Sequence, residues 1–442
     1  MIDFLATLVV VLICTWVASR YIHPFSGADR GVLWVSFVAH QVAGIVNIAV
    51  TRFYYEWGDM MSYYRFGVFA AERLRQNFWD LAPGFLGLLV HSPDPLAVPL
   101  PIEALPGNTG SIQALSAFAM LATDDSLYAT CALIAGAAFL SKVCLFKVVS
   151  EELPDLPRRP LLILCVLLPS ALFWSCSLIK ESFAMIGVLC ALYGWHLLSR
   201  GRDRLRATTM LLGGSVAIIL IKGYIFPAFV LAAVAWHVAR KVHERRGDVT
   251  FKAGHIVIAG VAAAAMVAAT GALLPQFGAD ALGDQLANLQ AIGATGDGGS
   301  DYTLGKSAGS AGSQAALAPL GLLTALFRPV IVEVKTPIVL LGALEMSFFL
   351  LAAVVVPFRR SVLSCFSELL RRPFLSFCAV FVLVFGTCVG LGTTNLGTLS
   401  RYRMPLTPFF GILLLALLAR DHAPLVVRRP VRRRSGEAEL TS

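Results

Sequence analysis

The amino-acid sequence predicts an all-α protein, a polytopic bundle of about 11 transmembrane helices. Hydrophobic residues make up 57% of the 442 residues and charged residues only 14%, whereas a soluble domain carries about 25% charged residues. The apolar segments are long enough for membrane-spanning helices and too long for barrel strands. Short loops rich in arginine separate many of these segments, as is typical of the cytoplasmic loops of membrane proteins.

The expected spans are residues 3–19, 32–51, 126–146, 160–176, 181–198, 207–222, 225–240, 253–273, 336–357, 374–392 and 404–420. The first is expected to be a retained span and not a removable signal, because Asp3 stands where a signal would be basic. Residues 207–240 are short for two crossings, but arginine-rich loops flank them on both sides. An even number of crossings must therefore lie between these loops, and Gly223 supplies the turn.

With these spans, 25 of the 36 lysines and arginines lie on one side of the membrane and 11 on the other. The positive-inside rule then predicts an outer N-terminus and an inner C-terminus. Residues 1–425 form a single membrane domain with two longer periplasmic segments, 52–125 and 274–335, and residues 426–442 form a basic cytoplasmic tail. The net charge of +9 follows from these loops, so we expect the lipid bilayer and not nucleic acid as partner.

The nine cysteines form no CxxC or Cys/His pairing, so no metal and no cofactor is expected. Functional candidates are instead the charged residues near span ends on the outer side, because such groups are costly beside hydrocarbon. In GDMMSYYRFG, Asp59 and Tyr63 share a face if the segment is helical. Asp59 could accept a proton from an acceptor hydroxyl, with Tyr63, Tyr64 and Arg65 binding sugar or phosphate. The alternative is an interfacial aromatic belt with a capping aspartate.

Lys180 and Glu181 are expected at the tight outer turn between the fourth and fifth spans, in WSCSLIKESF. Lys180 could bind phosphate, and Glu181 could pair with it or act as a base. Lys222 is expected in the same setting between the sixth and seventh spans. The alternative for all three is snorkelling at the membrane interface.

Arg328 precedes Pro329, which restricts its backbone to an extended conformation and so directs its side chain. In TTNLGTLSRYRMPLTP, Arg401 and Arg403 would point the same way if the backbone is extended and would diverge in a helix. Two arginines aimed at one point suit a pyrophosphate, whereas the alternative is charge on a solvated loop. Glu345 lies inside the span 336–357 and is a candidate proton site or partner for a cation.

Four motifs in this order resemble bacterial multi-pass proteins of polysaccharide assembly: GD…YY, PSALFWSCSLIKESF, LFRPV…LLGALE and TTNLGTLSRYRMPLTP. The resemblance is to O-antigen-polymerase-like and EpsG-like proteins, related to membrane glycosyltransferases of the GT-C type. It implies transfer from a polyprenyl-phosphate-linked or polyprenyl-pyrophosphate-linked sugar on the outer face of the cytoplasmic membrane. Other polysaccharide-assembly proteins would then be its partners.

The residues and the resemblance together predict a membrane glycan polymerase or glycosyltransferase. Asp59, or alternatively Glu181, would be catalytic, and the basic residues would bind the phosphate groups of the lipid carrier. Two alternatives remain open. One is a transporter or flippase for lipid-linked sugars or small anions, with Glu345 as a proton relay. The other is a non-catalytic scaffold of a secretion complex, in which the outer charges are individually dispensable.

Overall fold

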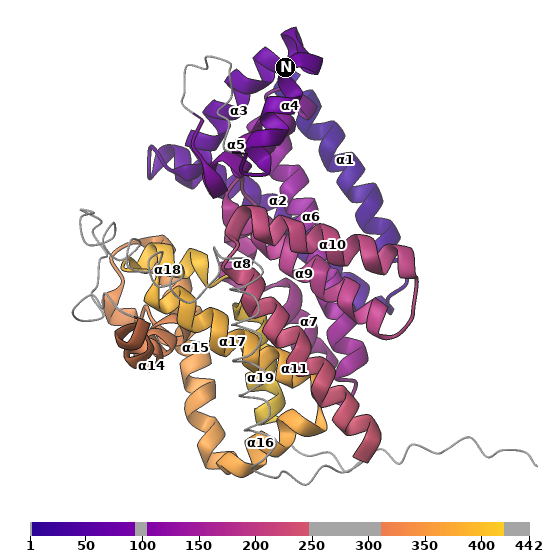
Figure 1. The fold of residues 1–442 in the computed structure, drawn as a ribbon, viewed down its shortest axis with the longest axis vertical. Coiled ribbons are helices and arrows are strands. Elements are labelled where there is room, and N and C mark those ends of the chain that lie inside the picture. The colour runs from indigo at the N-terminus through magenta and orange to yellow at the C-terminus, as the bar shows by residue number, and fades with distance from the viewer. Residues whose placement is uncertain (1, 93–103, 247–310, 420–442) are drawn as a thin grey trace, which may run out of the picture.

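The computed structural model describes residues 2–92, 104–246 and 311–419, and every regular element in these ranges is a helix (Figure 1). The long apolar helices are α1 (Ile2–Ile22), α2 (Gly27–Phe53), α6 (Leu127–Glu152), α9 (Lys180–Ser199), α10 (Arg204–Lys222), α11 (Ile225–Arg246), α15 (Pro337–Arg359) and α17 (Pro373–Leu391). The shorter helices are α3 (Asp59–Gln76), α4 (Phe78–Leu89), α5 (Gly107–Ala122), α7 (Arg158–Val166), α8 (Pro169–Trp174), α14 (Ala311–Phe327), η2 (Ile331–Glu333), α16 (Val362–Arg371), α18 (Leu396–Tyr402) and α19 (Thr407–Leu418).

Eight of these helices are long and apolar enough to cross a membrane, or nine if α18 and α19, which meet at 74°, form one bent span. The architecture is therefore compatible with a membrane helical bundle, and eight of the eleven expected spans correspond to these long helices. The expected span 160–176 is broken into α7 and α8, because Pro169 cannot donate a helical hydrogen bond. The expected span 404–420 begins at the α18–α19 bend, and the expected span 253–273 lies outside the described residues.

Local sequence signals account for where several helices begin. Ser126, Thr336 and Ser361 each precede a helix and accept a hydrogen bond from a backbone N–H of its first turn. These bonds satisfy donors that have no partner within the helix. Proline stands in the first turn of α15 and of α17, where its missing N–H costs nothing.

The segment 52–125, expected to be a long outer connection, contains the three helices α3, α4 and α5. They pack against one another beside the N-terminus, at the top of Figure 1. Phe85 of α4 and Phe66 of α3 are fully buried between them. The apolar stretch FWDLAPGFLGLL forms α4. This segment is thus a packed helical layer, and its α5 lies against α10 in the bundle.

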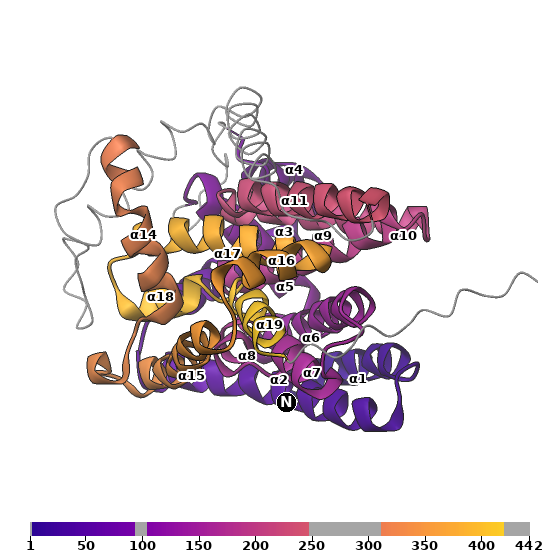
Figure 2. The same cartoon turned by 90° about the horizontal axis from the view of Figure 1, so that it is seen from below.

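Helices α9 and α10 form a close antiparallel hairpin. A Cβ atom at Gly194 would lie 2.4 Å from the backbone nitrogen of Leu211, and one at Gly214 would lie 2.5 Å from that of Ala191. Only glycine permits this approach, which is typical of close helix pairs in membranes. The hairpin places Lys222, the last residue of α10, beside the first turn of α9. Next to this hairpin, α11 lies alongside α17 (Figure 2).

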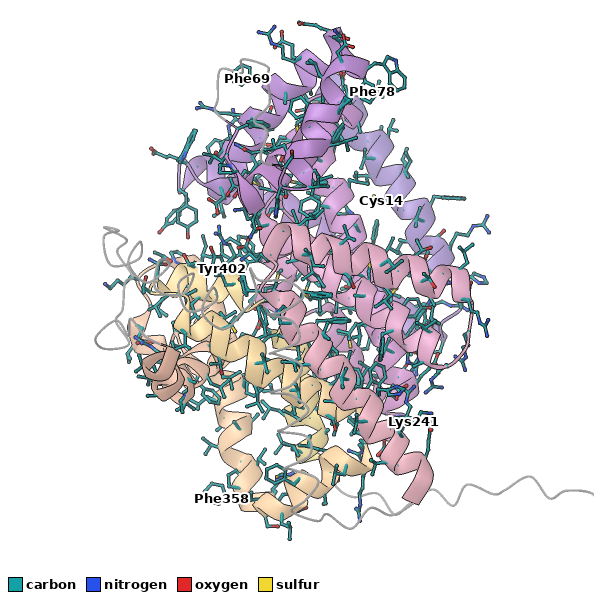
Figure 3. The ribbon with its side chains drawn as sticks, in the orientation of Figure 1. Cys14, Phe69, Phe78, Lys241, Phe358 and Tyr402 are labelled. Carbon is teal, nitrogen blue, oxygen red and sulfur yellow. The ribbon has the colours of Figure 1, made fainter. Side chains whose placement is uncertain are left out.

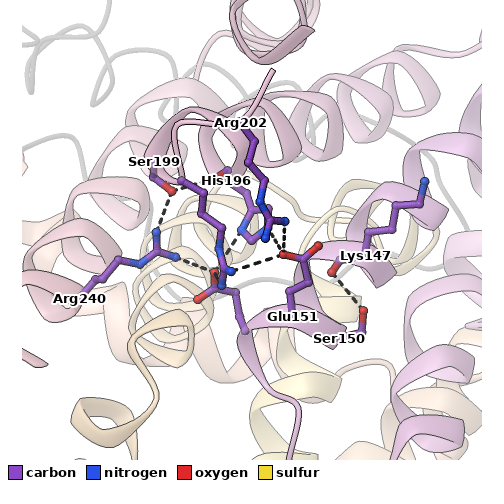
Figure 4. Close-up of polar contacts among 9 residues, drawn as sticks. Lys147, Ser150, Glu151, His196, Ser199, Arg202 and Arg240 are labelled. Atoms are coloured by element: carbon purple, nitrogen blue, oxygen red, sulfur yellow. Dashed lines mark hydrogen bonds and ion pairs between the residues drawn. The ribbon is translucent and has the colours of Figure 1, made fainter. Parts of the chain in front are cut away.

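A cluster of charged side chains marks one end of the α9–α10 hairpin (Figure 4). Glu152 accepts hydrogen bonds from Arg200 at 2.9 Å and from Arg240 at 2.6 Å, and Glu151 accepts one from Arg202 at 2.9 Å. We call these five residues the Glu152 cluster. Arg200 and Arg240 reach one carboxylate and therefore lie at the same end of the bundle. The opposite ends of α9 and α10 carry a second group of charges.

Candidate functional site

Four charged residues from four different helices form a continuous chain of ion pairs at this second end. Arg401 contacts Asp59 through Nη2 at 2.7 Å and Glu181 through Nε at 3.2 Å. Lys222 donates to the same Glu181 oxygen at 2.9 Å. We call Asp59, Arg401, Glu181 and Lys222 the ion-pair chain. The sequence placed these residues near span ends on one side, and the structure brings them into contact.

The helices themselves favour the charges that they carry here. Asp59 is the first residue of α3 and Glu181 the second residue of α9, so both carboxylates lie at helix N-termini. Lys222 ends α10, where the helix dipole favours a cation. The antiparallel hairpin of α9 and α10 sets Glu181 opposite Lys222. The Lys222 ammonium also lies 3.4 Å from the ring centroid of Tyr402, which stabilises its charge.

Exposure rises along the ion-pair chain. The side chains of Glu181 and Lys222 are 3% and 7% exposed, that of Arg401 19%, and that of Asp59 47%. The ion-pair chain therefore runs from the buried Glu181–Lys222 pair to the Asp59 carboxylate, which is accessible from outside the protein. Figure 3 labels Tyr402 beside this site, where α18 faces the helices of the first third of the chain.

Lys180 adds a further positive charge beside the ion-pair chain. Its ammonium donates to the Thr109 hydroxyl of α5 at 2.7 Å, and its charge interacts with all four members of the chain. The five residues carry three cations and two carboxylates, so one positive charge is in excess. Thr109 is a neutral partner, which leaves the charge of Lys180 available to an anion.

Tyr63 lies one helical turn after Asp59 on α3, on the same face, and is buried. Burial raises the pKa of Tyr63, and the Asp59 and Glu181 carboxylates raise it further. The phenol is therefore protonated at neutral pH and can donate a hydrogen bond. Tyr64 and Arg65 do not join the ion-pair chain. Tyr64 packs into a neighbouring apolar cluster, and Arg65 is exposed, with its guanidinium 4.7 Å from the ring centroid of Trp57.

Arg401 and Arg403 do not converge on one point, because the backbone that carries them is helical and not extended. Asn395 caps α18 by accepting hydrogen bonds from two backbone N–H groups, and α18 continues to Tyr402. Arg403 points away from the ion-pair chain. It is fully buried, and its Nη1 donates to the backbone carbonyls of Ala325 and Arg328.

Arg328, the third predicted arginine, forms an ion pair with Glu333 of η2. Burial alone would raise the pKa of Glu333, but hydrogen bonds from Arg328 and from the Val330 backbone lower it overall. The carboxylate is therefore ionised and holds the connection between α14 and α15. Arg328 and Arg403 thus belong to a second polar cluster beside α15, separate from the ion-pair chain.

Glu345 and Lys142 are two further charged residues that are buried within the bundle. Glu345 of α15 accepts hydrogen bonds from the backbone N–H and the hydroxyl of Ser170, at 2.8 and 2.6 Å. Lys142 of α6 is 1% exposed and donates to the Ala171 carbonyl and to Ser175. Glu345 was a predicted candidate. Lys142 was not, although it lies inside the expected span 126–146, and in the structure it is buried within α6.

The arrangement can bind an anion and can hold a carboxylate near an acceptor hydroxyl. Within residues 2–92, 104–246 and 311–419, no group of three histidine, cysteine or acidic side chains could hold a metal ion. All nine cysteines are free thiols. Comparison of the chain with known protein families, curated proteins and solved structures found no match.

Proposed function

We propose that the protein is a membrane glycosyltransferase or polymerase of cell-surface polysaccharide, with a polyprenyl-phosphate-linked or polyprenyl-pyrophosphate-linked sugar as donor. The observation that supports this most directly is the ion-pair chain, which joins buried cations to an accessible aspartate and has Lys180 beside it. In the proposed orientation, with the C-terminus in the cytoplasm, this site opens at the outer face of a bacterial inner membrane.

The excess positive charge suits the phosphate groups of such a donor. Lys180 would bind a phosphate oxygen directly, since its present partner Thr109 is neutral. Arg401 would bind a second oxygen through the guanidinium edge that Asp59 now occupies. As the bond between sugar and phosphate breaks, these cations would stabilise the negative charge that develops on the leaving phosphate.

Donor binding at Arg401 would also prepare the base. A phosphate competes with the Asp59 carboxylate for the same Nη2 atom, so its arrival releases Asp59 from its ion pair. A free carboxylate is a better proton acceptor than one held by a guanidinium. Asp59 would then accept the proton of the acceptor hydroxyl, while the phenol of Tyr63 donates a hydrogen bond to the sugar.

Glu181 has a different proposed role from the catalytic one that the sequence allowed. One of its oxygens contacts both Lys222 and Arg401, and its side chain is 3% exposed. A carboxylate in this setting cannot reach an acceptor and is held in its ionised form. We assign it the positioning of the two cations.

A gene replacement that encodes Arg401→Ala tests the proposal in a polysaccharide-producing host. We expect short polysaccharide chains and an accumulation of lipid-linked single units on the outer face, measured by gel analysis and mass spectrometry. The matched control is Arg65→Ala, which removes an exposed arginine outside the ion-pair chain. Polymer of normal length from Arg401→Ala contradicts the proposal. Accumulation on the inner face would favour a flippase instead.

A further inference from the structure

Side-chain donors reach three backbone carbonyls at the C-terminal ends of α7 and α8. The Ser36 hydroxyl donates to the Val166 carbonyl at 2.8 Å, at the end of α7. Asn47 donates to the Phe173 carbonyl at 3.4 Å, and the Ser182 hydroxyl to the Trp174 carbonyl at 3.1 Å. Backbone groups freed inside a membrane require such partners. The break between α7 and α8 is therefore stabilised by side chains of neighbouring helices.

The two buried charges hold opposite ends of α8. Glu345 accepts two hydrogen bonds from Ser170, in the first turn of α8. Lys142 donates to the Ala171 carbonyl at 3.0 Å and to the Ser175 hydroxyl at 2.9 Å, at the last turn. A carboxylate at the N-terminus and an ammonium at the C-terminus both complement the helix dipole.

The third hydrogen bond of Lys142 runs to His40 of α2, whose Nε2 lies 3.0 Å from the ammonium. The other ring nitrogen lies 2.7 Å from the Ser36 carbonyl, so the ring is neutral with its proton on Nδ1. All three protons of the ammonium thus have an acceptor, and each acceptor is uncharged. This complete set allows a charged lysine inside the bundle.

Only five residues separate the end of α8 from Lys180. They run from Ser175 to Ile179 and are all buried. The place of α8 therefore determines where Lys180 and Glu181 start α9. We call residues 169–179 the α8 segment.

We propose that Lys142 and Glu345 are positioning residues, which fix the α8 segment between them and thereby set Lys180 and Glu181 at the ion-pair chain. The role of that chain in phosphate binding rests on the proposed function, whereas the fixing of the segment does not. If one of these two charges is removed, the α8 segment would change its position between α6 and α15. Lys180 would then lose its alignment on the phosphate-binding side.

Cys176 reports on this segment directly, because it is fully buried and its thiol contacts the Leu172 carbonyl at 3.1 Å. A variant that retains Cys176 as its one cysteine is labelled with N-ethylmaleimide in native membranes. We expect Lys142→Met to raise the labelling rate at least about tenfold, since labelling follows the population of the opened segment. Glu345→Leu should have the same effect, and Glu345→Gln a smaller one because its amide oxygen still accepts a bond from Ser170.

Two controls separate local loosening from other causes. Lys147→Met makes the same substitution on the same helix, at a partly buried lysine that lies over Tyr21, and should leave Cys176 labelling unchanged. A second variant retains only Cys378, which is buried in α17, and reports unfolding of the bundle. Its labelling should not rise in Lys142→Met or in Glu345→Leu.

Unchanged Cys176 labelling in Lys142→Met and Glu345→Leu overturns the proposal. If these variants expose Cys378 as well, Ser175→Ala decides the matter, because it removes one acceptor of Lys142 and keeps the charge. If Cys176 stays protected from labelling in Ser175→Ala, the proposal is overturned. If Cys176 is labelled faster while Cys378 stays protected, the proposal is supported.

The labelling requires no glycan substrate, so it stands whether or not the proposed function does. A membrane assay of glycan extension provides a second measurement, of the half-saturating donor concentration and the maximal rate. There, Glu345→Leu should raise the half-saturating donor concentration more than it lowers the maximal rate, since it misaligns Lys180. Glu345→Gln should restore most of that loss. A fall in maximal rate alone, with no recovery in Glu345→Gln, contradicts a positioning role.

Discussion

Replacing Lys222 with methionine should destabilise the protein strongly, because it leaves the charge of Glu181 buried with one cation fewer. As whole residues, Lys222 is 5% exposed and Glu181 is 2% exposed. Their 2.9 Å contact is therefore almost completely shielded from solvent. Removing one partner of a buried ion pair costs about 3–5 kcal/mol in the free energy of unfolding. By contrast, the Asp59–Arg401 pair ends on a half-exposed carboxylate, so Asp59→Asn should cost about 1 kcal/mol or less.

Equilibrium unfolding in mixed SDS and detergent micelles measures both values. The decisive comparison is the double variant Lys222→Met with Glu181→Leu, which removes the buried carboxylate together with the lysine. It should recover more than half of the stability that Lys222→Met loses, since apolar residues can replace a buried pair at little cost. A double variant no more stable than Lys222→Met, or a single variant within about 1 kcal/mol of the wild type, refutes this reasoning.

Three further predictions concern other parts of the molecule. Arg403→Ala should lower stability without changing donor affinity, because Arg403 is fully buried and donates to backbone carbonyls away from the ion-pair chain; unfolding and binding measurements distinguish these effects. The pKa of Glu333 is lowered from 4.5, so its stabilising pair with Arg328 is present at neutral pH and is lost as pH falls below that value. Hydrogen exchange of residues 328–334, corrected for the intrinsic pH dependence, should therefore rise in acid, and Glu333→Gln should remove this change. A green fluorescent protein fused after residue 442 should fluoresce, because we place the C-terminus in the cytoplasm; a dark fusion with an active periplasmic reporter would reverse the orientation.

The sequence could predict which charges share an end of the bundle, because antiparallel spans return their ends to the same side. Lys222 and Glu181 stand at the facing ends of α9 and α10, and this follows from the positions of two turns. The alternating direction of the spans does not by itself bring the two side chains into contact. It depends on the close approach of the two helices at Gly194 and Gly214, which the pattern of apolar spans does not reveal.

The sequence could not predict the parts that depend on helix boundaries. The expected span 126–146 places Lys142 about one turn from a span end, and the charge count assigned it to the basic side of the membrane. In the structure α6 continues to Glu152, so Lys142 lies well inside the helix. For Arg401 and Arg403 a usable signal existed, since Asn395 is a favourable helix cap and precedes a segment without proline until Pro405. That cap predicts a helix, in which the two arginines diverge.

Binding of farnesyl pyrophosphate to the purified protein in detergent tests the central claim most directly. Arg401→Ala should weaken binding by about 10- to 100-fold, since a hydrogen bond to a charged group contributes about 1.5–3 kcal/mol and 1.4 kcal/mol corresponds to a factor of ten. Arg65→Ala, outside the ion-pair chain, should bind as the wild type does. Equal affinities of the wild type and Arg401→Ala would contradict the assignment of this site to a lipid-linked phosphate.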